Sequence, residues 1–274
     1  TMQLYDHTLP GGAWLRGWVR DASEAMPDYN VRPAVLILPG GGYARCSDRE
    51  SDPVGTQFLA AGYQVFLLDY TVADAPGKAP LRYAPLTDAA RAVLHLRRHA
   101  DELRLDPGRI AVCGFSAGGH LAACTALIAA DVEGELGLRG TERVLDAQPN
   151  AVILSYPVVT TGPLTHPGSA ANLAGEDKAL RARFSLENHV TGAPGTPPFF
   201  IWHTVADGSV PVENSLMLAQ ALQKQGISYE LHLFPTGGHG GSLCTNEVGK
   251  PSARNRAWMP LALSWLADVF DYHL

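Results

Sequence analysis

A serine flanked by glycines is the feature of this sequence most able to do covalent chemistry. Ser116 stands at the centre of Gly-Phe-Ser-Ala-Gly (114–118), between an apolar run at 110–113 and a stretch of small residues at 120–130 with helical character. A strand that enters a helix through Gly-x-Ser-x-Gly exposes the serine hydroxyl on a sharp turn, the nucleophile elbow. The N–H of Ala117 then points to where an oxyanion develops. The pattern predicts a nucleophile for acyl transfer, against the alternative of a chance match in a glycine-rich loop.

A serine hydroxyl needs a base to remove its proton, and the base needs a third group to orient it. Our candidate base is His239, because it lies in the loop Thr-Gly-Gly-His-Gly-Gly (236–241) directly after the last predicted strand. Catalytic side chains collect at such strand ends in open α/β sheets. Five other histidines lie in predicted helices or strands, or only four residues past the serine: His95, His99, His120, His203 and His232.

The candidate acid is Asp207, which follows the predicted strand 199–203 and opens a loop at 207–211. A carboxylate there can reach across the top of the sheet to the imidazole N–H of His239. The order serine, acid, histidine along the chain is the one that this strand–turn–helix architecture uses. Glu213 is the nearest rival, but it begins the next predicted helix, where an acidic residue is an ordinary N-terminal charge.

The second oxyanion donor is expected in the loop Pro-Gly-Gly-Gly-Tyr (39–43), which follows the predicted strand 34–38. Three consecutive glycines let backbone N–H groups approach a substrate oxygen without obstruction. We expect the oxyanion hole to combine a backbone N–H of this glycine loop with the N–H of Ala117. Three aromatic residues near these loops are candidates to line the substrate pocket: Tyr43, Phe115 and Tyr156.

The elements that must position these residues alternate along the chain. Short apolar runs followed by longer helical patterns indicate an α/β protein with a mostly parallel central sheet and helices on both faces. Strands are predicted at 34–38, 64–69, 109–114, 151–155, 199–203 and 228–234, and helices near 53–61, 86–103, 116–130, 212–225 and 254–270. Residues 2–20 indicate two edge strands joined at 10–12. Because no repeat, low-complexity tract or linker divides the chain, we expect one domain over 1–274.

One connection is unusually long. Residues 156–197 are rich in Pro, Gly and Thr and contain a short helical pattern near 177–187. A connection of this length in a compact domain is usually functional. We interpret it as a small cap over the site, with a surface excursion of no catalytic role as the alternative.

Composition limits the partners of the chain. Its 274 residues are 46% hydrophobic and carry a net charge of −6 with no cluster of Lys and Arg along the sequence. Nucleic acids and anionic membranes select concentrated positive charge, so neither is expected as a partner. No apolar run approaches the length of a membrane span. The N-terminus lacks the pattern of a signal peptide, which predicts a cytoplasmic protein, although a trimmed secreted chain would look the same.

The cysteines and histidines show no cofactor pattern. Four cysteines in a chain of 274 residues are too few for a disulfide framework. Cys46 and Cys244 follow presumed active-site loops and could meet in space, but we expect free thiols. No Cys-x-x-Cys or His-Glu-x-x-His spacing suggests a metal, so the chemistry is expected to need no metal and no cofactor.

Taken together, these motifs resemble the α/β-hydrolase superfamily over nearly the whole chain. The elbow through residue 122 is similar to that of carbohydrate acetylesterases related to the hormone-sensitive-lipase branch. That branch usually begins its oxyanion loop with His-Gly-Gly, whereas Pro39 stands in the place of the histidine here, so the chain is nearer to xylan-acetylesterase relatives. The resemblance implies a Ser116–Asp207–His239 triad, with Ala117 and Gly41 or Gly42 as oxyanion donors.

The resemblance also implies a substrate class. We expect a serine carboxylesterase that hydrolyses small O-acyl esters through an acyl-enzyme, with acetylated xylan or xylo-oligosaccharides as substrates. A feruloyl esterase, an aryl formamidase or a small peptidase on the same machinery remain alternatives. A hydrolase homologue that only binds a ligand is the alternative from a different class. The partner is then a small-molecule or oligosaccharide ester, and the oligomeric state stays open, a homodimer included.

Overall fold

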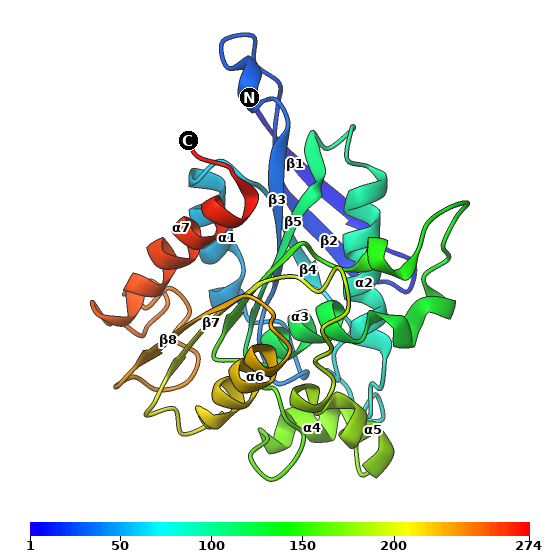
Figure 1. The fold of residues 1–274 in the computed structure, drawn as a ribbon, viewed down its shortest axis with the longest axis vertical. Coiled ribbons are helices and arrows are strands. Elements are labelled where there is room, and N and C mark those ends of the chain that lie inside the picture. The colour runs from blue at the N-terminus through cyan, green and yellow to red at the C-terminus, as the bar shows by residue number, and fades with distance from the viewer.

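An eight-stranded sheet runs through the computed structural model, which describes residues 1–274 (Figure 1). The strand order is β1-β2-β4-β3-β5-β6-β7-β8; the β1–β2 and β2–β4 pairs are antiparallel and the remaining pairs are parallel. The strands are β1 Met2–Thr8, β2 Trp14–Arg20, β3 Arg32–Leu38, β4 Gln64–Asp69, β5 Leu105–Phe115, β6 Ala151–Ser155, β7 Phe199–Thr204 and β8 Tyr229–Phe234. The predicted α/β class and the predicted edge strands in 2–20 are confirmed.

Helices cover both faces of this sheet. They are α1 Asp52–Ala60, α2 Ala84–Arg98, α3 Ala117–Leu127, α4 Pro167–Ala174, α5 Lys178–Phe184, α6 Glu213–Lys224 and α7 Trp258–Phe270. Short 3₁₀ turns span Pro27–Tyr29, Asp48–Glu50, Ala129–Glu135, Val144–Ala147, Leu186–Asn188 and Asn255–Ala257. α1 and α7 pack on one face and α2, α3 and α6 on the other (Figure 1). Every helix is too short or too polar to cross a bilayer.

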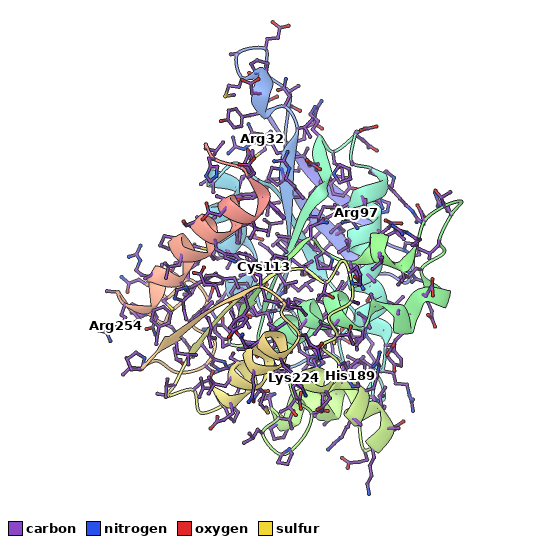
Figure 2. All side chains as sticks on the ribbon, in the orientation of Figure 1. Arg32, Arg97, Cys113, His189, Lys224 and Arg254 are labelled. Carbon is purple, nitrogen blue, oxygen red and sulfur yellow. The ribbon has the colours of Figure 1, made fainter.

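Successive side chains of a strand point to opposite faces of the sheet, and here both faces are covered by apolar core. In β3, Val35 and Ile37 join the core cluster that contains α1 and α7, whereas Leu36 and Leu38 join the cluster that contains α2 and α3. A parallel strand covered on both sides therefore reads as one continuous apolar run. Cys113 of β5 lies at the centre of the molecule and Arg254 at its edge (Figure 2).

The observed elements differ from the predicted ones mainly at their ends. The helix predicted over 86–103 ends at Arg98, and β5 begins at Leu105, earlier than the predicted residue 109. Arg104 takes a positive φ of 49° between them, which no helix can continue through. The helix predicted to residue 130 ends at Leu127, because Ile128 has φ −132° and leaves the helical region.

The long connection after β6 folds into α4, α5 and a 3₁₀ turn. Only the piece near 177–187 has a helical pattern in the sequence; α4 was not predicted. The side-chain amide of Asn172 in α4 donates to the carbonyl of Gly42 at 2.9 Å, which ties this segment to the Gly-Gly-Gly loop. The interpretation of 156–197 as a cap stays a prediction, but its first helix lies against the site.

The four cysteines are free thiols. Cys113 and Cys124 are buried in β5 and α3. Burial raises the pKa of Cys46 to about 12 and that of Cys244 to about 11. These thiols therefore stay protonated at neutral pH and act as small apolar side chains.

Candidate active site

The elbow holds Ser116 in a conformation that few residues adopt. Ser116 has φ 54° and ψ −117°, and it separates the end of β5 from the start of α3. A Cβ atom on Gly118 would lie 2.2 Å from the carbonyl oxygen of Leu38, so any side chain there would push α3 away from β3. Such strained residues persist where the surrounding structure fixes them, commonly at functional sites.

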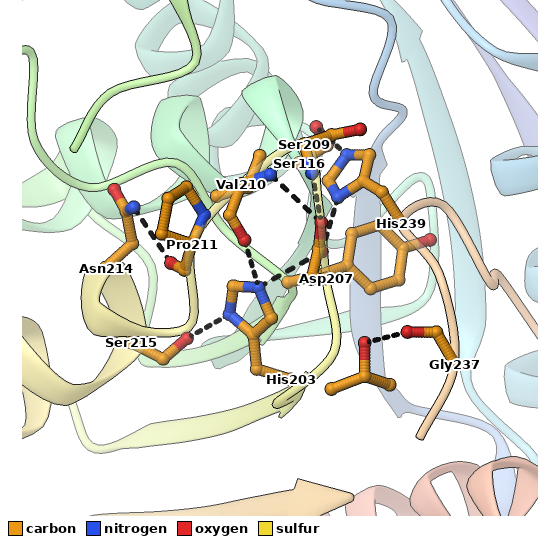
Figure 3. A network of polar contacts seen from close by, with 12 residues as sticks. Ser116, His203, Asp207, Ser209, Val210, Pro211, Asn214, Ser215, Gly237 and His239 are labelled. Atoms are coloured by element: carbon orange, nitrogen blue, oxygen red, sulfur yellow. Dashed lines mark hydrogen bonds and ion pairs between the residues drawn. The ribbon is translucent and has the colours of Figure 1, made fainter. Parts of the chain in front are cut away.

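Two loops bring the candidate base and acid to this serine. The Oγ atom of Ser116 lies 2.7 Å from Nε2 of His239, and Nδ1 of His239 lies 2.7 Å from Oδ2 of Asp207 (Figure 3). Ser116 follows β5, Asp207 follows β7 and His239 follows β8, so all three lie at the carboxyl edge of the parallel strands. The rival acid, Glu213, is exposed at the start of α6 and makes no hydrogen bond or ion pair with His239.

The acid is held as a buried anion. The Asp207 side chain has no exposed surface, and its Oδ1 accepts the N–H groups of Ser209 and Val210 at 2.9 Å each. Burial by itself would raise the pKa of Asp207, but hydrogen bonds from His203 and His239 outweigh it and hold that pKa well below its usual range. The carboxylate is therefore charged at neutral pH and can stabilise a protonated His239.

His203 also belongs to this network, although its position in the sequence indicates only a residue of a strand. Its Nε2 lies 3.2 Å from Oδ2 of Asp207 and 3.0 Å from the carbonyl oxygen of Val210, while Nδ1 lies 2.7 Å from Oγ of Ser215 (Figure 3). Because Nε2 faces two acceptors it must carry the proton, and Nδ1 accepts from the serine hydroxyl. His203 thus fixes the carboxylate from the side opposite to His239. A fully buried histidine inside β7 leaves no mark in the strand pattern that would separate it from a core residue.

The predicted oxyanion donors face the same place. Gly41 and Gly42 line the pocket that contains Ser116, and Ala117 follows Ser116 at the start of α3. The N–H groups of these three residues donate to no protein atom, so they are available to a ligand oxygen. Gly41 has φ 130°, and a Cβ atom there would lie 2.1 Å from the carbonyl oxygen of Arg45, so only glycine fits this turn.

A buried glutamate joins the oxyanion loop to the histidine loop. Glu50 is 3% exposed; its Oε2 accepts the N–H of Gly40 at 2.8 Å and its Oε1 accepts the hydroxyl of Tyr156 at 2.7 Å. The same hydroxyl accepts the N–H of Ser242 at 2.8 Å. The Tyr156 ring also meets the His239 ring edge to face, with centroids 5.0 Å apart. The sequence around Glu50 gives no sign of this role, because an acid in a polar loop is ordinarily a surface residue.

The three aromatic residues expected to line the pocket do not line it. The Tyr43 hydroxyl meets Nδ1 of His120 at 2.8 Å in the core, and Phe115 is fully buried among other aromatic rings. Tyr156 is 2% exposed and supports the site from behind. The expectation followed their sequence positions beside the loops, but at each position the side chain points into a core cluster.

The pocket wall is polar instead. The cavity of about 490 Å³ above Ser116 has a single apolar side chain, Ala44, in its wall. His166 and Asn172 enter from the long connection after β6. The Nδ1 atom of His166 accepts the N–H of Ser169 at 3.1 Å, so a neutral His166 carries its proton on Nε2. Burial, followed by the nearby His239, lowers the pKa of His166, which keeps it neutral. No group of three His, Cys, Asp or Glu side chains is arranged to hold a metal ion.

A parallel sheet with antiparallel edge strands, a serine elbow after β5 and loops after β7 and β8 define the chain as an α/β-hydrolase. The family model described as BD-FAE matches residues 20–222, and the chain belongs to that family. This range includes Ser116 and Asp207, whereas His239 lies beyond it.

Relatives with named activities agree with this class. The chain is 38% identical over 219 residues to an endo-1,4-beta-xylanase B of Butyrivibrio fibrisolvens. The aligned region covers 79% of the chain and 33% of that protein. The chain is 27% identical over 222 residues to an acetylxylan esterase of Xylanibacter ruminicola, which covers 78% of the chain and 42% of that protein. The chain thus spans less than half the length of these two curated relatives.

A solved structure matches the chain almost end to end. It is an acetyl ester-xyloside bifunctional hydrolase from Caldicellulosiruptor lactoaceticus, with 34% identity, a TM-score of 0.79, and coverage of 97% of this chain and 91% of that one. By fold and family, the chain is an α/β-hydrolase that resembles carboxylic ester hydrolases, acetylxylan esterases among them.

Proposed function

We propose that the chain removes acetyl groups from acetylated xylan or xylo-oligosaccharides, with Ser116, His239 and Asp207 as its catalytic triad. One observation carries the proposal: a single imidazole joins the serine hydroxyl and a buried carboxylate at 2.7 Å on each side, in the wall of an open pocket. The names of the relatives, an acetylxylan esterase and an acetyl ester hydrolase among them, support the acetyl ester as substrate.

The geometry implies the first half of the reaction. Nε2 of His239 takes the proton of the Ser116 hydroxyl as Oγ attacks the ester carbonyl carbon. The carbonyl oxygen becomes an oxyanion, which accepts hydrogen bonds from the N–H of Ala117 and from the Gly41–Gly42 loop. The charged Asp207 stabilises the imidazolium through Nδ1 without taking its proton.

The second half returns the enzyme to its starting state. The imidazolium of His239 donates its proton to the leaving sugar oxygen, the carbon–oxygen bond of the ester breaks, and an acetyl group stays on Ser116. His239 then takes a proton from a water molecule, which attacks the acyl carbon. The second tetrahedral intermediate releases acetate, and the proton on Nε2 goes back to the Ser116 oxygen.

The pocket favours acetyl over feruloyl esters. A feruloyl group needs an aromatic or apolar slot, because burying its ring is the main source of binding free energy. Here Ala44 is the only apolar side chain of the wall, and the three aromatic residues near the site are buried in the core. A small acetyl group on a hydroxyl-rich sugar suits such a polar wall better.

The decisive test is Ser116→Ala. Removing the nucleophile should lower kcat on acetylated xylo-oligosaccharide by about 10⁴-fold or more, while circular dichroism and the thermal midpoint show the chain still folded. A fluorophosphonate probe should label the wild-type chain at Ser116 and leave the variant unlabelled. Retained turnover in a folded variant would refute the assignment, and an unlabelled wild type would favour a homologue that only binds a ligand.

A substrate comparison separates the related activities. Turnover of acetylated xylo-oligosaccharide, methyl ferulate and N-formylkynurenine by the same preparation is expected to be highest on the acetyl ester. A higher kcat/KM on methyl ferulate would reverse our interpretation of the polar wall.

A further inference from the structure

Three cationic side chains line the pocket that contains Ser116: Arg45, Arg49 and Lys250. Two of them follow the Gly-Gly-Gly loop and the third lies beyond His239, so the sequence, which has no Lys/Arg cluster, does not reveal the group. The chain as a whole carries a net charge of −6, which makes a cationic pocket a local exception.

Each cation is tied to one of the two loops that carry the candidate chemistry. The Arg45 side chain begins beside the oxyanion loop. If Gly41 carried a Cβ atom, that atom would lie only 2.9 Å from Cγ of Arg45. Arg49 lies beside the histidine loop. If Gly240, which follows His239, carried a Cβ atom, that atom would lie 3.7 Å from Nη2 of Arg49. Lys250 donates through Nζ to the carbonyl of His239 itself.

No carboxylate of the protein neutralises these charges. None of the three forms a salt bridge, and their hydrogen bonds go to neutral carbonyls: Arg49 to Val248 at 3.3 Å, and Lys250 to His239. The single acid in the pocket wall is Glu50, and its two oxygens already accept Gly40 and Tyr156. Other arginines of the chain do pair with an acid, as Arg98 does with Glu142 and Arg183 with Asp131.

Unpaired cations around a polar pocket raise the local concentration of anions and can bind an anionic group directly. The guanidinium groups of Arg45 and Arg49 have the planar fork that suits a carboxylate, whereas Lys250 adds a point charge. A cavity of about 490 Å³ has the size of a small-molecule site. Its polar wall provides hydrogen-bond partners for sugar hydroxyls on either side of the reacting ester.

We infer that this pocket selects acyl esters of acidic sugars, with the carboxylate of a uronic acid bound among Arg45, Arg49 and Lys250. The inference rests on the proposed esterase function and adds the charge of the substrate to it. A neutral acetylated sugar would still reach Ser116, but it would lack the group that these three cations attract.

The test compares two esters with the acetyl group on the same ring hydroxyl that differ only at C6: O-acetyl glucuronic acid carries a carboxylate there and O-acetyl glucose a neutral hydroxymethyl group. We expect kcat/KM to be about ten- to hundredfold higher for the uronate at low ionic strength, since three exposed ion pairs at about two- to fivefold each multiply to that range. The preference should shrink as NaCl rises from about 0.02 to about 0.5 M, because salt screens exposed charges. Equal kcat/KM values on the two esters would overturn the inference and leave the esterase proposal intact.

Charge-neutralising variants locate the effect. Arg45→Gln and Lys250→Gln should each lower the uronate-to-glucose ratio of kcat/KM by about two- to fivefold. Lys224→Gln is the matched control, because Lys224 is an exposed cation at the end of α6 and is not part of the pocket wall. An unchanged ratio in both pocket variants, or the same decrease in the control, would overturn the inference.

A binding measurement covers the case in which neither sugar ester is hydrolysed. Free glucuronate should then inhibit hydrolysis of an activated acetyl ester, p-nitrophenyl acetate, more strongly than free glucose, and Arg45→Gln should remove the difference. Inhibition by glucuronate with no turnover of sugar esters would contradict the proposed function and keep the anion site. Equal inhibition by the two sugars would contradict the anion site.

Discussion

Two pockets of this molecule contain histidine and arginine side chains, but they differ in what surrounds the imidazole. The pocket above Ser116 has a volume of about 490 Å³, and a second one between β1 and α2 has about 420 Å³. In the second pocket His95 stacks on His7 at 4.3 Å and on His99 at 4.1 Å between ring centroids. The wall of the second pocket contains three histidines, whereas that of the pocket above Ser116 contains two.

The partners of each histidine account for the difference. The His239 ring has a buried carboxylate on one nitrogen and an alcohol on the other. His95 meets the Tyr5 hydroxyl at 2.6 Å, but it forms no ion pair with a carboxylate. Burial, followed by the repulsion of His99, His7 and Arg98, lowers the pKa of His95 to about 4. A histidine becomes a useful base where an acid stabilises the proton it takes up, and basic neighbours do the reverse.

The largest expected effect comes from removing that acid. Asp207→Asn keeps the size of the side chain but replaces the charged acceptor of His239 by an amide, which stabilises neither the correct tautomer nor the imidazolium. We expect kcat for acetyl-ester hydrolysis to fall by about 10⁴-fold with the fold intact, as measured by steady-state kinetics and thermal unfolding.

The rival acid provides the control for this prediction. Glu213 is exposed in the first turn of α6, so Glu213→Gln should leave kcat within about twofold of wild type and affect only the charge near the helix N-terminus. A large loss in Glu213→Gln with activity retained in Asp207→Asn would exchange their roles.

The sequence predicts the sheet well because buried parallel strands are continuous apolar runs. Such a run at 34–38 becomes the buried centre of β3, with side chains in both core clusters. The ends of elements depend on single residues that turn the backbone, such as Arg104 with its positive φ, and no periodicity announces them. Helix α4 was missed because its eight residues include a proline and a glycine, which are poor helix formers inside a longer segment.

For the site, the sequence reveals residues held by backbone geometry but not those held by long-range contacts. Ser116 and the Gly-Gly-Gly loop are visible because a sharp turn demands glycine at fixed positions. Glu50 and His203 are not, since their roles depend on hydrogen bonds to partners such as Tyr156 and Ser215 that only the fold supplies. The aromatic residues were misplaced for the same reason: adjacency in the chain does not fix on which side of the sheet a ring points.

A smaller loss is expected from the glutamate behind the oxyanion loop. In Glu50→Gln the amide can accept from Gly40 or from Tyr156 but not from both, which leaves one buried donor without a partner at a cost of about 1–3 kcal/mol. Because Glu50 orients the loop without touching the reacting atoms, kcat should fall about ten- to hundredfold, below the effect of losing an oxyanion donor outright, with KM little changed.

Tyr156→Phe is the matched variant for this pair. It removes the hydroxyl that joins Glu50 to Ser242 but keeps the ring that meets His239. We expect kcat to decrease less than in Glu50→Gln. The double variant should lose less activity than the two single variants combined, since both substitutions break one hydrogen-bond network. A change in KM alone would place Glu50 in substrate binding and not in positioning of the loop.

The smallest effect on activity is expected in the second pocket, where the consequence is for stability. His95→Gln should leave kcat/KM near neutral pH within about twofold, because His95 belongs to no part of the candidate site. In the unfolded chain a histidine binds its proton near pH 6.5, whereas in the folded chain His95 binds one only near about 4. Between these values protons favour the unfolded state, so His95 lowers the free energy of unfolding as the pH falls from 6.5 towards 4.

Thermal midpoints measured from pH 7.5 to pH 4 test this directly. The acid-side decrease should be smaller in His95→Gln than in wild type, because glutamine does not titrate, while at pH 7.5 the variant should be the less stable one through its altered contact with Tyr5. His232→Gln, on β8 and outside the stack, controls for the loss of any histidine. If the two variants showed the same dependence on pH as wild type, the histidine stack would not be the source of acid sensitivity. The comparison between His239, which has a carboxylate as its partner, and His95, which has basic neighbours, would then be supported only by the pocket above Ser116.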